Sequence, residues 1–251
     1  MTTVDVVVPV YNEEHALPRT IPKLRGFLSE PLFPYTWRIV IADNASVDGT
    51  PEVGQHLAGE YGDQVEYVRL EAKGRGRALK RTWLASPMEI VSYMDVDLSS
   101  GLEAFPTLIG AIAEGGYDIA IGSRLARGSQ VKRSLGRRVL TGGYNLMIKA
   151  MFSTRFSDAQ CGFKAVSQQA AQRVVPLIED NNWFFDTELL ILAEKLGYRV
   201  KDVPVVWDED RDTRVNVAAT ITEDLRGLLR LRLRRPWRAA APGDKTSDRA
   251  R

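Results

Sequence analysis

The sequence predicts an α/β protein built on one mainly parallel central sheet with helices on both faces. Five short runs rich in Val and Ile recur along the chain, namely "VDVVVPV", "WRIVIA", "VEYVRL", "EIVSYM" and "YDIAIG". Each run is followed by a longer stretch with helix-like character, and strands that alternate with helices join into parallel sheets whose faces the helices cover. The chain of 251 residues, of which 44% are hydrophobic and 26% charged, is long enough to bury a full core.

Polar residues follow three of the predicted strands, at the point where each strand ends. The first strand leads into Tyr11 and Glu13, the second into Asp43, and the "SYM" strand into Asp95 and Asp97. Open α/β sheets bind ligands outside the carboxyl ends of their strands, where the strand order reverses. The alternative is that Asn, Asp and Gly begin turns and cap helices here, as in "DNASVDGT". For any single residue both interpretations stay open.

The segment "EAKGRGRALKRTW" follows the third strand and combines two glycines with Lys73, Arg75 and Arg77 at the start of a predicted helix. Exposed backbone N–H groups and the helix dipole favour an anion at such a position. The segment lacks the third glycine of a dinucleotide fingerprint and does not match the Walker pattern, which argues against an oxidoreductase and a P-loop NTPase. The alternative is a solvated basic helix start.

Asp95 and Asp97 lie one residue apart on an extended segment, so both side chains point to the same side while Val96 points away. Two like charges repel each other unless a cation lies between them. Mg²⁺ and Mn²⁺ prefer oxygen ligands, and Mg²⁺ commonly takes one or two carboxylates together with substrate phosphates and water. The pair therefore predicts a site for Mg²⁺ or Mn²⁺ and a diphosphate.

The composition argues against export. The start, "MTTVDVVVPV", lacks the basic and long apolar regions of a signal peptide, and no segment reaches the roughly 18 uninterrupted apolar residues of a membrane-spanning helix. The single cysteine, Cys161, excludes an intramolecular disulfide and suits a reducing cytosol. We therefore expect a cytoplasmic protein, and a net charge of +2 does not indicate a nucleic-acid partner.

Several segments, in this order, resemble the family 2 glycosyltransferases and within them the dolichyl- and polyprenyl-phosphate hexose synthases. These segments are "VVVPVYNEE", "IADNASVDGT", "KGRGRAL", "MDVDLSS", "IGSR", "DAQCGFKA" and "NNWFFDTELLILAEKLGYRVKDVPVVW". The last two are more similar to glucose than to mannose synthases. The resemblance implies a GT-A-type nucleotide-diphospho-sugar transferase fold and inverting, metal-dependent transfer of a hexose to a polyprenyl or dolichyl phosphate. UDP-glucose is the favoured donor and GDP-mannose a possible one.

The resemblance also implies roles for individual residues. Pro9, Tyr11, Glu13 and Asp43 match positions that hold the nucleotide base and ribose, and the expected donor site further contains Lys73, Asp95, Val96, Arg211 and Arg214. Asp95 and Asp97 match the metal-binding pair, and Ser99 stands where mannose-type enzymes commonly have a Gln. Asp97 and Arg124 are the expected catalytic residues. The acceptor phosphate is expected to meet Arg124, Arg133 and Arg137.

The expected acceptor determines the mechanism. A lipid monophosphate is already an anionic nucleophile at neutral pH, so no catalytic base is required. One alternative is a family 2 enzyme that acts on a soluble or saccharide hydroxyl, with a carboxylate such as Asp158 or Asp186 as the base. The other is a noncatalytic binding protein that keeps the fold. For Arg124 alone, a surface salt bridge is the alternative to a phosphate contact.

The end of the chain is far more basic than the rest. The segment "TITEDLRGLLRLRLRRPWR" predicts a helix, with Leu225, Leu228, Leu229, Leu231 and Leu233 on one face and Arg226, Arg230 and Arg234 on the other. Arg232 interrupts the apolar face, and Trp237 is a candidate headgroup anchor. This helix is predicted to attach the protein peripherally to the inner face of the cell membrane. The alternative is a helix packed on its own sheet.

We therefore expect a glycosyltransferase domain at residues 1–215, a basic amphipathic helix at residues 216–238 and a disordered tail at residues 239–251. A second candidate for lipid contact is the segment of residues 139–152. Its side chains Tyr144, Met147, Ile148 and Met151 either line a lipid path or belong to the core. The sequence does not predict the oligomeric state.

Overall fold

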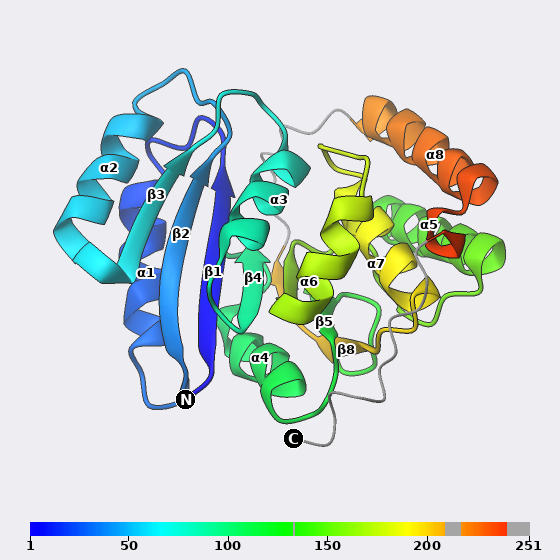
Figure 1. The fold of residues 1–251 in the computed structure, drawn as a ribbon, viewed down its shortest axis with the longest axis horizontal. Coiled ribbons are helices and arrows are strands. Elements are labelled where there is room, and N and C mark those ends of the chain that lie inside the picture. The colour runs from blue at the N-terminus through cyan, green and yellow to red at the C-terminus, as the bar shows by residue number, and fades with distance from the viewer. Residues whose placement is uncertain (133, 209–216, 240–251) are drawn as a thin grey trace.

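The computed structural model describes residues 1–132, 134–208 and 217–239, and within these ranges seven strands form one sheet in the order β3-β2-β1-β4-β7-β5-β8 (Figure 1). The strands are β1 (Thr3–Val10), β2 (Thr36–Asp43), β3 (Val65–Arg69), β4 (Ile90–Met94), β5 (Ile119–Ser123), β7 (Phe163–Ser167) and β8 (Val200–Pro204). β7 runs antiparallel to β4 and β5, and the other pairs are parallel. The five predicted strands and the mainly parallel sheet are confirmed.

Helices lie on both faces of this sheet, as the alternating pattern predicted. They are α1 (Leu17–Leu28), α2 (Thr50–Tyr61), α3 (Arg75–Ala85), α4 (Phe105–Ala113), α5 (Leu135–Phe152), α6 (Gln168–Val174), α7 (Phe185–Lys195) and α8 (Val217–Arg234). Short 3-10 turns are η1 (Gly62–Gln64), η2 (Leu102–Ala104), η3 (Val175–Leu177) and η4 (Pro236–Arg238). A separate parallel pair joins β6 (Gln130–Lys132) to β9 (Val206–Asp208).

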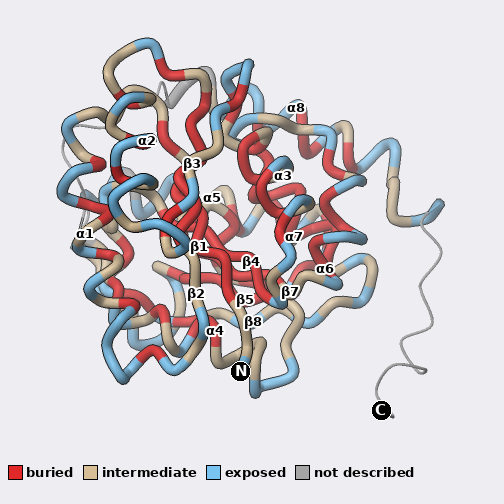
Figure 2. The backbone as a smooth tube through the Cα atoms, turned by 60° about the vertical axis from the view of Figure 1, so that its left-hand side comes forward, coloured by how far each residue is buried: buried red, intermediate tan, exposed pale blue. Residues whose placement is uncertain are grey.

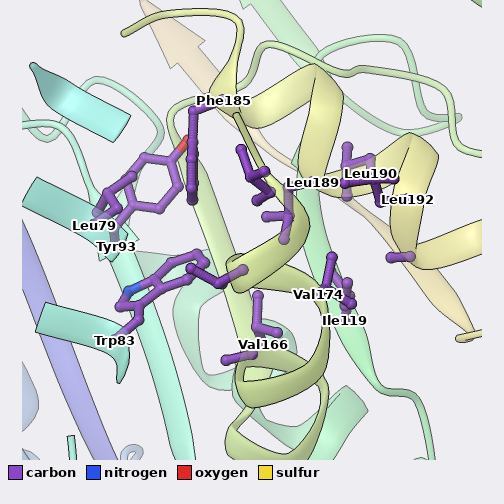
Figure 3. Packing of buried hydrophobic residues seen from close by; sticks show 14 of the residues in the cluster. Leu79, Trp83, Tyr93, Ile119, Val166, Val174, Phe185, Leu189, Leu190 and Leu192 are labelled. Carbon is purple, nitrogen blue, oxygen red and sulfur yellow. The ribbon is translucent and has the colours of Figure 1, made fainter. Parts of the chain in front are cut away.

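The central strands are buried on both sides, which explains their continuous Val and Ile runs (Figure 2). Successive residues of β1 point to opposite faces, so Val6 and Val8 pack with α1 and α4 whereas Val7 packs with α3, α6 and α7. On the second face, Trp83 of α3 lies beside Tyr93 of β4 and close to Phe185 of α7 (Figure 3). The two cores hold the sheet rigidly from both sides.

The sheet opens at the carboxyl ends of β1 and β4. β1 pairs with β2 as far as Val10 opposite Asp43, but its pairing with β4 ends at Val7 opposite Tyr93. Pro9 follows, and a proline has no N–H to continue a ladder. The strand order reverses at this junction, which is the position where α/β sheets form a ligand crevice.

The C-terminal helix α8 packs against α5 and α7, and its leucines divide between two faces. Leu228 and Leu231 are buried in the core, whereas Leu225, Leu229 and Leu233 are exposed. The predicted single leucine face is therefore wrong. Leu228 and Leu231 are three residues apart and form a buried inner stripe, and the exposed leucines are four residues apart and form an outer stripe. Both spacings return to nearly the same side of a helix.

Other residues near the C-terminus also contact the domain. Trp237, the predicted headgroup anchor, packs edge-on against Phe152 of α5 with ring centroids 6.2 Å apart. Ile148 is buried in the core, and Tyr144, Met147 and Met151 pack against it, so the core interpretation of these α5 side chains is confirmed. No described helix has both the length and the hydropathy that crossing a bilayer requires. Of the tail predicted at residues 239–251, residues 240–251 lie outside the described residues.

A buried carboxyl attaches α8 to the body of the protein. Asp224 is 3% exposed, and its Oδ2 accepts a hydrogen bond of 2.6 Å from the side chain of Gln160. Burial raises the pKa of Asp224 to about 7, hydrogen bonds from Gln160 and Tyr144 oppose the rise, and the charges of Asp180 and Glu223 add to it. The protonated form is therefore the one that the folded state prefers.

We predict that this carboxyl makes the protein less stable as the pH rises from about 4 to 7. The folded state binds a proton in this interval that the unfolded state has released, so the free energy of unfolding falls by at most about 1.4 kcal/mol per pH unit and levels off above the folded pKa. Asp224→Asn removes this slope. Urea unfolding between pH 5 and 8 measures it.

The neighbouring Glu223 provides the control, because it is exposed and differs by one position. Glu223→Gln should retain nearly the full pH dependence of the wild type. If the slopes of Asp224→Asn and the wild type are equal, Asp224 is not the group that titrates.

Candidate functional site

Two loops at the carboxyl edge of the sheet are joined by side chains from "YNEE" and "DNASVDGT". The N–H of Asn12 donates to Ser46 Oγ at 3.0 Å, and that of Glu13 donates to Thr50 Oγ1 at 2.8 Å. Asn12 has a positive φ of 57°, and its Oδ1 accepts from the N–H of Val47 at 3.0 Å. These contacts match the turn interpretation of the motif and fix the loop after β1 against the loop after β2.

Asp43 ends β2 and is fully buried among donors. Its Oδ1 accepts from the N–H of Ser46 at 2.9 Å, and its Oδ2 accepts from Tyr67 at 2.6 Å and from Arg69 at 3.1 Å. Burial and the Asp43 carboxylate raise the pKa of Tyr67 to about 12, so its hydroxyl remains a donor. Sequence analysis missed Arg69. The feature that could have identified Arg69 is its position at the end of β3, opposite Asp43 in register.

An aromatic ring and a lysine lie at the same edge. The ammonium of Lys73 is 3.7 Å from the ring centroid of Tyr11, a cation–π contact between the loop before α3 and the loop after β1. Tyr11 and Pro9 are half-buried and Lys73 is exposed. The structure therefore brings Lys73 to Tyr11 and places both, with Pro9 and Asp43, at the carboxyl edge of the sheet.

Asp95 follows β4 directly, whereas Asp97 lies in a turn in which the N–H of Leu98 donates to the carbonyl of Asp95 at 3.0 Å, so the extended segment predicted for this pair is wrong. The Asp95 side chain is 41% exposed, and its Oδ1 accepts from Arg75 at 3.1 Å. Asp97 is exposed, and its Oδ1 accepts from the N–H of Ser99 at 2.9 Å. Gly162 must be a glycine, because a Cβ there would lie 1.7 Å from Asp95 Oδ2. Between the aspartates, the carbonyl of Val96 accepts from Thr20 Oγ1 at 2.7 Å.

The donor atoms of this pair fit a hard divalent ion that receives its other ligands from elsewhere. Among the described residues, no group of three or more His, Cys, Asp or Glu side chains could hold a metal ion by itself. Asp95 and Asp97 supply carboxylate oxygens only, and Ser99 lies beside them. Such a set suits Mg²⁺ or Mn²⁺ bound jointly by one or two carboxylates and a ligand's phosphates.

The basic segment before and within α3 is oriented differently from what the sequence suggested. α3 begins at Arg75 as predicted, but the N–H of Arg77 donates to the carbonyl of Asn181 at 3.0 Å. At Gly76 a Cβ would lie 2.7 Å from the Cβ of Phe185, so this glycine permits close packing of α3 on α7. Arg75 points inward and donates to Asp186 at 2.5 Å. Part of the predicted anion site, namely the N–H of Arg77 and the guanidinium of Arg75, is therefore bonded to other residues of the protein itself.

Arg124 follows β5 and forms an ion pair with Asp158. Its Nε and Nη2 donate to the two carboxylate oxygens at 2.7 and 2.9 Å, and its backbone N–H adds a third bond at 3.1 Å. The Arg124 side chain is 9% exposed and lies 5.4 Å from the ring centroid of Trp207. Ser123 Oγ is 2.6 Å from Ser157 Oγ and holds the same two loops together. A contact of Arg124 with an acceptor phosphate stays a prediction.

Four other arginines were predicted to contact phosphates. Arg133, Arg211 and Arg214 lie outside the described residues, and Arg137 lies in α5. Their predicted contacts with phosphates stay predictions.

Both carboxylates that were considered as catalytic bases are held by cations. Burial alone would raise the pKa of Asp158, but Arg124 outweighs it and the pKa lies below its usual value. Burial likewise acts against the charged form of Asp186, and Lys164 and Arg75 together lower its pKa. A carboxylate with a lowered pKa and its oxygens engaged is a weak proton acceptor. The geometry therefore gives neither residue the properties of a general base.

The sequence profile described as glycosyl transferase family 2 matches residues 5–175. Glycosyltransferase AglD of Haloferax volcanii is 34% identical over 223 residues, which cover 87% of this chain and 35% of that protein. A dolichyl-phosphate beta-glucosyltransferase of Dictyostelium discoideum is 28% identical over 240 residues, covering 91% of this chain and 73% of that protein. The chain thus spans about a third of one relative and about three quarters of the other.

Solved structures share the fold. Glucosyl-3-phosphoglycerate synthase from Mycobacterium tuberculosis, in complex with Mn²⁺, UDP and phosphoglyceric acid, superposes with a TM-score of 0.65 at 20% identity. The match covers 97% of this chain and 80% of that chain. At this level of identity the likeness concerns the fold, and it confirms the predicted GT-A-type arrangement of the sheet.

We predict that Asp158→Asn lowers the free energy of unfolding by about 3–5 kcal/mol, because it leaves the Arg124 charge buried without its carboxylate. Urea denaturation at pH 7 measures the loss. The double variant Asp158→Asn/Arg124→Gln should lose less than the sum of the two single variants, since no buried charge then stays unpaired. Strictly additive losses would contradict this account of the pair.

Proposed function

The chain belongs to glycosyl transferase family 2, and from this premise we propose that it transfers a hexose from a nucleoside-diphosphate sugar to a polyprenyl phosphate with inversion at the anomeric carbon. The observation that carries the proposal is the pairing of Asp158 and Asp186 with cations. An acceptor hydroxyl would need a carboxylate base, for which these two were the named candidates, whereas a lipid phosphate is already an anion. The name of the Dictyostelium relative supports a dolichyl phosphate acceptor and glucose as the hexose.

In this proposal the donor occupies the crevice at the carboxyl ends of β1, β2 and β4. The nucleoside lies toward Tyr11, Asp43 and Arg69, where buried hydrogen bonds hold the polar groups in place. Asp95 and Asp97 hold Mg²⁺ or Mn²⁺ against the diphosphate, as the Mn²⁺ and UDP complex of the synthase from Mycobacterium tuberculosis supports. When bound, the ion stabilises the negative charge of the departing nucleoside diphosphate. UDP-glucose is the favoured donor, and GDP-mannose is the second.

The chain's own residues orient the reactants. Arg124 is fixed by Asp158 close to the loop that carries Gly162, which touches Asp95. A guanidinium fixed in this way attracts the acceptor phosphate and reduces its repulsion from the donor phosphates. Holding two anions in line for attack at the anomeric carbon is then the main contribution of the protein. Arg133 and Arg137 are proposed to contact the acceptor phosphate, and Arg211 and Arg214 are proposed to contact the donor diphosphate.

The test is incubation with labelled UDP-glucose, Mn²⁺ and polyprenyl phosphate, followed by lipid extraction. We expect label in the lipid phase, and excess EDTA should abolish it. Asp97→Asn should lower the rate at least about tenfold, because one ligand charge opposite the leaving diphosphate is lost. A parallel reaction with GDP-mannose decides between the two donors.

Full transfer in excess EDTA would contradict the role of the metal. Transfer to a sugar or another soluble hydroxyl, with none to polyprenyl phosphate, would support the alternative acceptor class. In that case the rate should fall steeply at acidic pH, as the base becomes protonated. A protein that binds no sugar nucleotide at all would support the noncatalytic alternative.

The outer side of α8 extends the proposal to the membrane. Its exposed apolar residues recur every four positions, Ile221 at 38% exposure, Leu225 at 47%, Leu229 at 57% and Leu233 at 73%. Exposed Arg226 and Arg232 lie beside this stripe. Each basic residue near an anionic surface contributes about 1 kcal/mol, and the apolar stripe adds buried area. We propose that this stripe attaches the protein to the inner face of the cell membrane, where the lipid acceptor lies.

Substitution of the outer stripe tests the attachment without exposing the core. Leu225→Ser/Leu229→Ser should reduce the fraction that sediments with anionic vesicles by at least about threefold and leave the melting temperature nearly unchanged. Leu32→Ser is the matched control, because Leu32 is 73% exposed and lies between α1 and β2. Equal sedimentation of all three proteins would contradict the proposal. Attachment should also weaken as salt screens the arginines.

A further inference from the structure

Arg75 lies between two carboxylates, one at the candidate metal site and one beneath it. Its Nη2 donates to Asp95 Oδ1 at 3.1 Å, and its Nη1 donates to Asp186 Oδ2 at 2.5 Å. The guanidinium carbon is 4.7 Å from the ring centroid of Tyr93 and 5.0 Å from that of Trp183. The side chain is 10% exposed. Two rings and two carboxylates therefore fix one buried positive charge.

Asp186 is itself held from the other side. Its Oδ1 accepts from the Tyr93 hydroxyl at 2.5 Å and lies 3.0 Å from the ammonium of Lys164. Lys164 is fully buried on β7, where its ammonium also donates to the carbonyl of Cys161 at 2.5 Å. Tyr93 lies in β4, the strand that leads into Asp95. The groups that hold Asp186 are thus buried residues of two strands in the middle of the sheet, and Tyr93 packs among the core side chains (Figure 3).

The charges in this chain of contacts balance. Arg75 and Lys164 supply two positive charges, and Asp95 and Asp186 supply two negative ones. Arg75 Nη1 lies 2.5 Å from Asp186, whereas Arg75 Nη2 lies 3.1 Å from Asp95. Asp95 therefore contacts only one nitrogen of the guanidinium, at the longer of the two distances. If Asp186 were neutral, Asp95 would be the one remaining carboxylate in contact with Arg75 among the described residues. A two-point pair of arginine and carboxylate is a strong interaction, and it would compete with a metal ion for the same oxygens.

We propose that Asp186, fixed by Lys164, is a positioning residue that neutralises Arg75 and thereby leaves the Asp95 carboxylate available to the divalent ion. The inference rests on the proposed function, since it assumes that Asp95 binds the metal of a sugar-nucleotide donor. It also assigns a task to a carboxylate that would otherwise be the natural candidate for a base. Asp186 contacts neither donor nor acceptor in this role and acts through Arg75.

The test is calorimetric titration of Mn²⁺ into the protein with saturating UDP and no acceptor. Asp186→Asn should lower the Mn²⁺ affinity by about tenfold, because Arg75 then draws Asp95 into a full ion pair. Lys164→Met should stay within about twofold of the wild type, since Asp186 still neutralises Arg75. Asp186→Glu keeps the charge and should stay within about threefold, which provides a second measurement if Asp186→Asn does not fold.

Glu188→Gln is the matched control. Glu188 lies two residues further along α7, its side chain is 1% exposed, and it accepts from an arginine of α8, Arg230, at 2.6 Å. This variant removes a comparable buried charge pair away from Asp95. It should lower the melting temperature and leave the Mn²⁺ affinity unchanged.

Several outcomes would overturn the inference. Unchanged Mn²⁺ affinity in Asp186→Asn, together with a lost acidic limb in its pH–rate profile, would make Asp186 a base. Equal losses of Mn²⁺ affinity in Asp186→Asn, Lys164→Met and Glu188→Gln would show that the effect is general destabilisation. A tenfold loss of Mn²⁺ affinity in Asp186→Glu would show that the charge of residue 186 is not what maintains the affinity. Wild-type protein that binds no Mn²⁺ with UDP would contradict the proposed function itself.

Discussion

The reversal of strand order between β1 and β4 is the constraint from which the candidate site follows. β1 stays paired with β2 to its end, whereas its pairing with β4 stops at Val7, two residues before Pro9. The chain segments that leave β1, β2 and β4 therefore emerge around one opening. Tyr11, Asp43 and Asp95 come to this edge because the register of the sheet ends their strands there. Their mutual repulsion or attraction has little part in it.

Buried charge is the second constraint, and it limits the chemistry. Asp43, Asp158 and Asp186 are each in contact with an arginine, and each lies near the carboxyl edge of the sheet. Burying an ion pair contributes little to stability compared with apolar packing of the same volume, so stability alone does not explain this concentration. Carboxylates held in this way orient cations instead of accepting protons. Such a surface suits an acceptor that is already an anion better than it suits a hydroxyl, because a hydroxyl must lose a proton.

The sequence was sufficient for five of the seven strands of the sheet, the helices that follow them and the polar edge, because hydrophobic period and strand-end residues are local signals, but β7 and β8 were not predicted. The sequence did not predict contacts between segments that lie far apart along the chain. Arg75 looks like a surface cation beside two glycines, and it turns inward because Asp186, 111 residues away, lies beneath it. Lys164 falls within an ordinary strand pattern, so nothing local distinguishes it, and the strand-end position of Arg69 does not by itself show that Arg69 lies opposite Asp43. Helical periodicity revealed that α8 is amphipathic, but not that Leu228 packs inward while Leu229 stays exposed.

The two sides of α8 connect the proposed membrane contact with the acceptor side of the site. Its inner face holds Asp224, which is bonded to Gln160. Gln160 lies in the same short loop as Asp158, the partner of Arg124, and as Gly162, the neighbour of Asp95. Because these contacts form one continuous chain, the position of α8 helps to set the position of the loop that fixes Arg124. A helix that only anchored the protein would not need a buried carboxyl at this point, so α8 is an integral part of the catalytic fold.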